Sequence, residues 1–241
     1  MDVGRWAFLF YAMLSAIIVA GGSSQRIGFD KLFAAIAGEP VIAHAIRAFE
    51  RAKSVGEIVV VTREERHDEI RKINSSAGFK KIRAIVPGGE RRQDSVRAGL
   101  DRIDRETKYV AVHDAARPLI TPEQIERAFE QCRVHGAAAL AQPVNDTLKR
   151  VDADLLVVGS VDRHQLYAMQ TPQIFERKLI EDAYRAVFAE NILVTDEVSA
   201  VERLGYKIAL VLNDEFNLKI TYPRDLPVAD FIVRDRAKSG R

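Results

Sequence analysis

The chain of 241 residues has a single cysteine, so no disulfide can form within it, and Cys132 lies in a helical pattern typical of a small buried residue. Neither sign of charge dominates, because 36 Lys and Arg residues face 34 Asp and Glu residues and no basic block stands out. We therefore expect no nucleic-acid partner. The apolar run from Trp6 to Leu14 is shorter than the roughly 20 residues of a membrane span, so we expect no membrane partner either.

Several catalytic and binding motifs are also missing. The G-x-G-x-x-G fingerprint and the G-x-x-x-x-G-K-[ST] loop are absent, and the first absence argues against a nicotinamide-dependent oxidoreductase. The five histidines lack the spacing of metal ligands. No Ser/His/Asp or Cys/His arrangement supports covalent hydrolysis. We interpret His113 as a buried residue at a strand end rather than as a base.

Apolar strands alternate with helical patterns along most of the chain. The predicted strands are residues 16–20, 57–62, 82–86, 109–113, 137–141 and 207–212. The predicted helices are residues 40–52, 64–75, 93–103, a segment opened by Thr121, 176–188, 196–204 and 223–233. Uninterrupted apolar strands between helices predict an α/β fold with a parallel sheet covered on both faces. Ligands of such folds bind at the carboxyl ends of the strands.

One domain is expected, residues 13–233, because the chain shows no repeat, clear linker or low-complexity tract. We interpret residues 1–12 as an N-terminal extension, with Met13 as the functional start. A signal peptide cleaved near Ala20 would remove the strand that supports the turn after it, so we expect a cytoplasmic protein.

The pattern changes from about residue 143. Residues 143–173 contain a short antiparallel excursion, formed by segments 146–151 and 155–160, and its edge strands are expected to make a subunit contact. At the other end of the domain, residues 234–241 are expected to be a frayed tail.

A glycine turn follows the first predicted strand. Gly21 and Gly22 leave backbone N–H groups without partners after residues 16–20, and such groups bind anions, phosphate above all. Arg26 and Lys31 add positive charge at the same place. The stretch therefore indicates capture of a polyphosphate such as a nucleoside triphosphate, although strands also end in glycine for the turn alone.

A carboxylate follows the fourth predicted strand, residues 109–113. Asp114 lies three residues before Arg117, and in a cleft that holds phosphates it is a candidate Mg²⁺ ligand, because Mg²⁺ takes one or two carboxylates plus phosphate oxygens. The alternative is that Asp114 and Arg117 pair with each other and cap a turn.

The third motif begins with the pair Gly88 and Gly89. Two adjacent glycines let the backbone approach a base or a ribose, and Arg92 and Ser95 lie in the first turn of the helix that follows. The alternative is a capped helix with solvated arginines.

Residues 217–221 alternate apolar and polar side chains. A strand there would place Lys219 and Thr221 on one face, which is either solvent or the site. Thr171 and Thr195 lie in turns with hydroxyl groups, which suit a second phosphate or a polyol.

Together these motifs make the chain resemble the 2-C-methyl-D-erythritol 4-phosphate cytidylyltransferase family from about Ala16 to Phe231. The matching stretches are 20–22 with Arg26 and Lys31, 88–96, 112–118, 143–149, 161–163, 171–173, 195–197 and 217–221. The resemblance implies a Rossmann-like nucleotidyltransferase fold, a mostly parallel twisted sheet with helices on both faces and the antiparallel excursion as a dimerisation element. It also implies CTP, Mg²⁺ or another divalent cation, a homodimer and release of pyrophosphate.

The resemblance further assigns roles to residues. Arg26 and Lys31 would stabilise charge on the triphosphate, and Asp114 would hold the metal. Lys219 and Arg163 would position the acceptor phosphate, with Arg163 reaching across from the second subunit. The residues implied to bind the nucleotide are Ala20, Gly21, Gly22, Gly88, Gly89, Arg92, Ser95 and Ala115. The residues implied to bind the acceptor are Arg117, Thr147, Thr171 and Thr195.

The chain departs from the family pattern around the first turn. Ser24 stands near the place of a further glycine, and Asp30 replaces a usual proline. The segment from Arg26 to Lys31 is also shorter than is common.

The function expected from this resemblance is transfer of a cytidylyl group from CTP to 2-C-methyl-D-erythritol 4-phosphate, a step of non-mevalonate isoprenoid precursor synthesis. One alternative is a cytidylyltransferase that acts on ribitol 5-phosphate or another sugar phosphate. A second is a nucleotide-binding module without catalysis, against which the joint presence of Arg26, Lys31, Asp114 and Lys219 argues.

Overall fold

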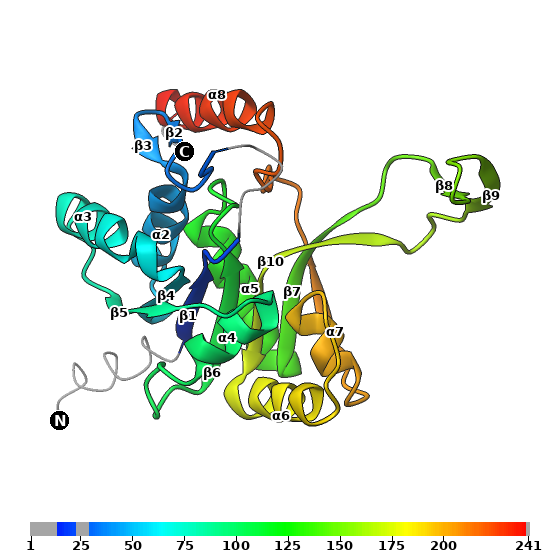
Figure 1. Cartoon of the computed structure of the whole chain (residues 1–241), viewed down its shortest axis with the longest axis horizontal. Coiled ribbons are helices and arrows are strands. Elements are labelled where there is room, and N and C mark those ends of the chain that lie inside the picture. The colour runs from blue at the N-terminus through cyan, green and yellow to red at the C-terminus, as the bar shows by residue number, and fades with distance from the viewer. Residues whose placement is uncertain (1–13, 23–28, 240–241) are drawn as a thin grey trace, which may run out of the picture.

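The computed structural model describes residues 14–22 and 29–239. In these ranges a seven-stranded sheet forms the centre of the molecule, with the strand order β11-β7-β10-β6-β1-β4-β5 (Figure 1). Its strands are β1 (Leu14–Val19), β4 (Val55–Thr62), β5 (Ile82–Pro87), β6 (Tyr109–Asp114), β7 (Ala137–Pro143), β10 (Tyr167–Glu176) and β11 (Ala209–Leu212). Every neighbouring pair is parallel except those that involve β10. The expected mostly parallel α/β sheet is confirmed.

Strand β10 is the element that the apolar pattern missed. It lies between β6 and β7 and runs antiparallel to both. Its buried stretch includes Gln170, Thr171 and Gln173, which are at most 4% exposed. A search for runs of apolar residues passes over a strand whose buried side chains are polar, because their hydrogen bonds to distant residues are not visible in the local sequence.

Helices cover both faces of the sheet, as expected (Figure 1). The first face carries α2 (Val41–Arg51), α3 (His67–Ala77), α5 (Pro122–His135) and α8 (Asp225–Lys238). The second face carries α4 (Arg92–Leu100), α6 (Arg177–Ala189) and α7 (Glu197–Glu202). The side chains of β1 alternate between the two cores, with Ala16 and Ile18 in the first and Ile17 in the second.

Shorter elements complete the described part of the chain. They are β2 (Ala35–Ile36), β3 (Glu39–Pro40), the 3₁₀ turn η2 (Glu64–Arg66), β8 (Leu148–Val151) and β9 (Val157–Val161). No helix in residues 14–22 and 29–239 is long and apolar enough to cross a membrane.

Strands β8 and β9 pair antiparallel at the end of an arm, residues 144–166, which projects from the body of the molecule (Figure 1). The antiparallel excursion predicted in this region is thereby confirmed. Large apolar side chains of the arm are exposed to solvent in the isolated chain, including Leu155 at 79% and Leu156 and Val157 at 64% each. Contiguous exposed apolar groups of this kind mark interaction surfaces.

The end of the chain differs from the expected frayed tail. Helix α8 continues past Val233 to Lys238, so residues 234–238 are helical. The guanidinium of Arg236 donates a hydrogen bond to the carbonyl of Leu119 at 2.6 Å, and this contact fixes the last turns against the body. The predicted extension, residues 1–12, and Met13 lie outside the described residues.

Gly99 brings α4 close to the sheet. A Cβ atom at this position would lie 2.5 Å from Cγ2 of Ile17 and 3.1 Å from Cγ2 of Val61. Both neighbours belong to buried strands, β1 and β4, and interiors this dense do not yield without strain. Helix α4 therefore holds its first turn, with Arg92 and Ser95, at a defined distance from the end of β1.

We predict that Gly99→Val lowers the free energy of unfolding by about 2–3 kcal/mol, because the added methyl groups overpack the contact with Ile17. Urea denaturation followed by circular dichroism measures the change. Gly159→Val is the control, since a Cβ at Gly159 meets no atom within 4 Å. Equal stability of the two variants would contradict the close approach.

Candidate functional site

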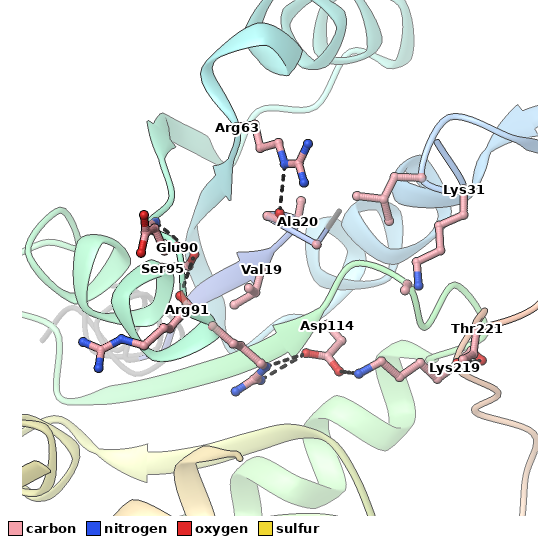
Figure 2. A pocket seen from close by; sticks show the side chains of 16 residues that line it. Val19, Ala20, Lys31, Arg63, Glu90, Arg91, Ser95, Asp114, Lys219 and Thr221 are labelled. Atoms are coloured by element: carbon pink, nitrogen blue, oxygen red, sulfur yellow. Dashed lines mark hydrogen bonds and ion pairs between the residues drawn. The ribbon is translucent and has the colours of Figure 1, made fainter. Parts of the chain in front are cut away.

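A cavity of about 430 Å³ opens at the carboxyl ends of β1 and β6 (Figure 2). Nine of the residues predicted for the site line it: Ala20, Gly21, Gly22, Lys31, Gly89, Arg92, Ser95, Asp114 and Lys219. They come from five separate stretches of the chain, which the sheet topology brings to one edge. This is the edge at which ligands of α/β sheets bind.

The other predicted residues lie elsewhere. Gly88, Ala115, Arg117 and Thr171 are near the cavity but do not line it, and Thr195 is an exposed residue before α7. Thr147 and Arg163 belong to the arm that projects from the body of the molecule (Figure 1), and neither lines the cavity. Arg26 lies outside the described residues.

The two glycine turns meet at the first turn of α4. The hydroxyl of Ser95 accepts a hydrogen bond from the N–H of Gly89 at 3.2 Å. A Cβ on Gly88 would lie 2.6 Å from that hydroxyl oxygen, and a Cβ on Gly21 would lie 3.2 Å from it. A side chain at Gly88 would therefore displace the hydroxyl of Ser95, so the close approach of this turn to α4 favours glycine there.

Asp114 is the buried carboxylate of the cavity. Its Oδ1 lies 3.0 Å from Nη2 of Arg92, and its Oδ2 accepts a hydrogen bond from Nζ of Lys219 at 2.7 Å (Figure 2). Burial by itself raises the pKa of Asp114, but the positive charges of Arg92 and Lys219 outweigh it and hold the pKa well below the ordinary value. The carboxylate is thus ionised at every physiological pH.

Arg117 does not pair with the side chain of Asp114, so the capped-turn alternative is wrong about the partners. Its guanidinium instead donates to the carbonyl of Asn217 at 2.7 Å and to the carbonyl of Met169 at 3.4 Å. The N–H of Ile220 also donates to the carbonyl of Ala116 at 2.8 Å. These bonds hold residues 217–221 against the end of β6, although those residues form no regular strand.

Arg92 also binds a second carboxylate, which the sequence did not single out as a site residue. Nη1 and Nη2 of Arg92 donate to the two carboxylate oxygens of Glu197 at 2.6 and 3.0 Å. Glu197 is fully buried and also accepts a hydrogen bond from the hydroxyl of Tyr184 at 2.9 Å. Burial lowers the pKa of Arg92, but Glu197 and Asp114 outweigh it and raise that pKa above the ordinary value.

Lys31 approaches the cavity from the opposite side to α4 (Figure 2). Its Nζ donates a hydrogen bond to the carbonyl of Ile220 at 2.7 Å, one residue from Lys219. The ammonium groups of Lys31 and Lys219 therefore lie near each other, where residues 219–221 form part of the wall of the cavity. An anion bound between them and the glycine turns would meet positive charge on two sides.

His113 and Thr171 form a buried pair behind Asp114. The Thr171 hydroxyl accepts a hydrogen bond from the N–H of Asp114 at 3.1 Å and lies 3.0 Å from Nδ1 of His113. Nε2 of His113 lies 3.2 Å from the carbonyl of Arg117 and donates to it. Burial lowers the pKa of His113 to about 4, against a weaker upward effect of Asp114. His113 is thus a neutral structural group, as expected, and no histidine lines the cavity.

A divalent cation fits the donor set of this cavity. In the described ranges no three His, Cys, Asp or Glu side chains come together. Mg²⁺ does not need such a cluster when substrate phosphates supply most of its ligands. Asp114 is ionised, faces the cavity and has a lone pair to spare on Oδ2 beside the bond from Lys219. One carboxylate together with phosphate oxygens can therefore hold the ion.

Arg66 and Glu197 are the functional candidates that the sequence reasoning missed. Both side chains are charged and buried. Arg66 donates to the carbonyl of Ala20 and Glu197 accepts from Arg92, and each partner is distant in the sequence. Glu197 carried a signal, because it stands in the matched stretch 195–197. Arg66 carried none.

Comparison with known proteins gives one consistent result. A sequence profile of the family described as 2-C-methyl-D-erythritol 4-phosphate cytidylyltransferase matches residues 14–235. A protein of that name from Caldanaerobacter subterraneus is 42% identical over 228 residues, which cover 92% of this chain and 99% of the relative. Another protein of that name, from Pelotomaculum thermopropionicum, is 37% identical over 231 residues, which cover 95% of this chain and 96% of that relative. The crystal structure of 4-diphosphocytidyl-2C-methyl-D-erythritol synthase from Anaerococcus prevotii superposes with a TM-score of 0.81 at 30% identity, over 92% of this chain and 96% of that chain.

The fold, the charged cavity at the carboxyl edge and these relatives together define an enzyme of the nucleotidyltransferase class. Within this class, the chain belongs to the 2-C-methyl-D-erythritol 4-phosphate cytidylyltransferase family. The resemblance drawn from the motifs is confirmed.

We predict that His113 makes the protein less stable as the pH falls from 6.5 towards 4. The unfolded histidine takes up a proton near pH 6.5, whereas the folded one does so only at about 4. Protons thus favour the unfolded state in that window, and the full stability is present above it. Between pH 6.5 and 5 the free energy of unfolding should drop by about 1–2 kcal/mol from this group.

Urea denaturation at several pH values measures the slope. His113→Gln keeps a donor and an acceptor but does not titrate, so its slope should be much smaller. His44, whose pKa burial also lowers, contributes equally to both proteins. Identical slopes for the two proteins would show that His113 is not the group responsible.

Proposed function

We propose that this enzyme transfers the cytidylyl group of CTP to 2-C-methyl-D-erythritol 4-phosphate, which yields 4-diphosphocytidyl-2-C-methyl-D-erythritol and pyrophosphate. The observation that carries the proposal is a cavity in which two lysines and two glycine turns surround one ionised carboxylate. Such a site suits a polyphosphate with a metal ion. The family and its named relatives supply the substrates.

In the proposed reaction, a phosphate oxygen of the acceptor attacks the α-phosphorus of CTP in line. The new phosphorus–oxygen bond forms while the bond to the β-phosphate oxygen breaks, and pyrophosphate leaves with the electron pair. The acceptor phosphate is already a nucleophile, so no general base is required. This agrees with a cavity that no histidine lines and with a neutral, buried His113.

Catalysis then rests on positioning and on charge stabilisation. Lys31 and Lys219 would neutralise the negative charge that grows on the phosphoryl oxygens, and Arg26 is proposed to act with them. Asp114 would hold Mg²⁺, and the ion would supply further positive charge at the phosphates. Lys219 pairs with Asp114, so its ammonium group lies beside the proposed metal position.

The proposed nucleotide-binding residues are Ala20, the glycines of the two turns, Arg92, Ser95 and Ala115. Ser95 supports this role through its contact with the Gly89 N–H. For the acceptor we propose a supporting role of Arg117 and Thr171, whose polar groups hold residues 217–221 and Asp114 from behind. Direct acceptor contacts by Thr147 and Thr195 stay predictions, as does the cytoplasmic location.

A homodimer is part of this proposal. Arg163 donates to the carbonyl of Asn145 within the arm, the arm projects from the body of the molecule (Figure 1), and none of its residues lines the cavity. We therefore propose that Arg163 serves the cavity of a second copy rather than that of its own chain. The exposed apolar side chains of Leu155 and Leu156 give the arm a surface for that copy.

We predict that the wild-type enzyme releases pyrophosphate from CTP with 2-C-methyl-D-erythritol 4-phosphate, and that Lys31→Ala and Lys219→Ala each lower kcat by about 10²–10³-fold. The physical reason is the loss of one cation that stabilises the transition state. Steady-state pyrophosphate release measures both effects. Lys72→Ala is the control, because Lys72 is an exposed residue of α3.

The same assay tests the acceptor. Faster turnover with ribitol 5-phosphate would contradict the proposed substrate but not the reaction class. Near-native turnover of both lysine variants would contradict the proposed roles of Lys31 and Lys219.

We also predict that Arg163→Ala and Lys219→Ala chains are each inactive and regain activity when they are mixed after unfolding and refolding. In a mixed dimer, one cavity keeps its own Lys219 and receives the intact Arg163 of the partner. Random pairing then restores about a quarter of the wild-type sites. No recovery would indicate that Arg163 acts within its own chain, whereas an active Arg163→Ala chain would show that Arg163 has no role. Size-exclusion chromatography with light scattering checks the dimer itself.

A further inference from the structure

Arg66 ties together the two segments that carry the proposed phosphate-binding groups. It ends the 3₁₀ turn η2 after β4 and is 7% exposed. Its Nη1 donates to the carbonyl of Ala20 at 2.7 Å, and its Nη2 donates to the carbonyl of Gly22 at 3.1 Å. Its Nε lies 2.6 Å from Oδ2 of Asp30. All three sides of the guanidinium are therefore in use.

The carbonyl contacts set the direction of the amide groups in the glycine turn. In a trans peptide the C=O and the N–H point in opposite directions, and the peptides of this turn are trans. The bond to the carbonyl of Ala20 therefore turns the N–H of Gly21 away from Arg66. Nε of Arg63 holds the carbonyl of Gly21 in the same way at 3.3 Å, which directs the N–H of Gly22.

These contacts engage the carbonyl groups of the turn, which would otherwise repel an anion. A carbonyl oxygen carries negative partial charge and would repel a phosphate, whereas an N–H attracts it. The arginines hold the carbonyls of Ala20, Gly21 and Gly22, and no described residue accepts a hydrogen bond from the N–H of Gly21 or Gly22. The turn is thus prepared for phosphate before the nucleotide arrives.

The third contact joins the turn to Lys31. Asp30, the next residue in the chain, binds Arg66 through Oδ2 and accepts a hydrogen bond from the N–H of Leu32 through Oδ1 at 3.2 Å. The ion pair therefore fixes the backbone on which Lys31 stands. Asp30 is the residue that replaces a usual proline of the family, so in this chain an ion pair supplies the constraint at that point.

We propose that Arg66 is a positioning residue for the triphosphate of the nucleotide, which acts through the glycine turn and through Asp30. This rests on the proposed function. A lysine cannot take the same role, because one ammonium group is a compact charge and cannot span two carbonyls and a carboxylate in a fixed plane.

The test compares Arg66→Lys and Arg66→Met with the wild-type protein. Titration calorimetry gives the dissociation constants of CTP and of CMP, steady-state kinetics gives KM for the acceptor, and thermal unfolding gives Tm. We expect both variants to bind CTP about 10–100-fold more weakly, as the loss of charged hydrogen bonds implies. Binding of CMP, which lacks the β- and γ-phosphates, and KM of the acceptor should change by less than about 3-fold.

Arg71→Met is the matched control. Arg71 lies on α3 and binds only the exposed Asp68 among the described residues, so its loss should leave all these quantities unchanged. If Arg66→Met does not fold, the test rests on Arg66→Lys, which keeps a positive charge beside Asp30 and is therefore expected to fold.

The proposal is overturned if both folded variants bind CTP as tightly as the wild type. It is equally overturned if affinity for CTP, CMP and the acceptor falls in parallel with Tm, because that pattern belongs to a purely structural residue. A wild-type enzyme that binds CTP but does not transfer its cytidylyl group would overturn the proposed function alone, and the test of Arg66 would then rest on the CTP and CMP titrations and on Tm.

Discussion

The charge balance around Asp114 is the interaction on which the site depends. Two carboxylates and two cations alternate in the order Glu197, Arg92, Asp114 and Lys219, with contacts of 2.6–3.0 Å. Each buried charge is compensated by the next, and an unpaired member would be costly in this environment. The chain of pairs runs from the fully buried Glu197 to the edge of the cavity, where Lys219 and a free lone pair of Asp114 meet the solvent.

The sheet supplies the positions that this charge balance requires. Asp114 ends β6, Arg92 begins α4, and Glu197 begins α7. Strand β10 connects these parts through polar groups: Gln173 accepts hydrogen bonds from the N–H groups of Glu197 and Val198 at 3.1 and 3.0 Å. The buried polar residues of β10 therefore fix the place of charged residues on either side of it, which explains polar side chains at the centre of a sheet.

Local patterns in the sequence indicated most of the elements and most of the cavity. Apolar runs located six strands of the sheet, and glycine turns after strands located one wall of the site. The apolar pattern did not predict strand β10, because the polar groups of Gln170, Thr171 and Gln173 find their hydrogen-bond partners in other elements. The assumed end of the last helix was wrong, because the contact between Arg236 and Leu119 crosses more than a hundred residues.

The sequence alone determined the fold class, the family and the residues that gather at the carboxyl edge, because hydrophobic periodicity and turn chemistry are local properties. Only the tertiary structure decided which charges pair. Asp114 binds Arg92 and Lys219 rather than the nearby Arg117, and Arg66 holds the glycine turn, because ion pairing in a protein interior follows distance in space and the relief of desolvation, neither of which the order of residues records.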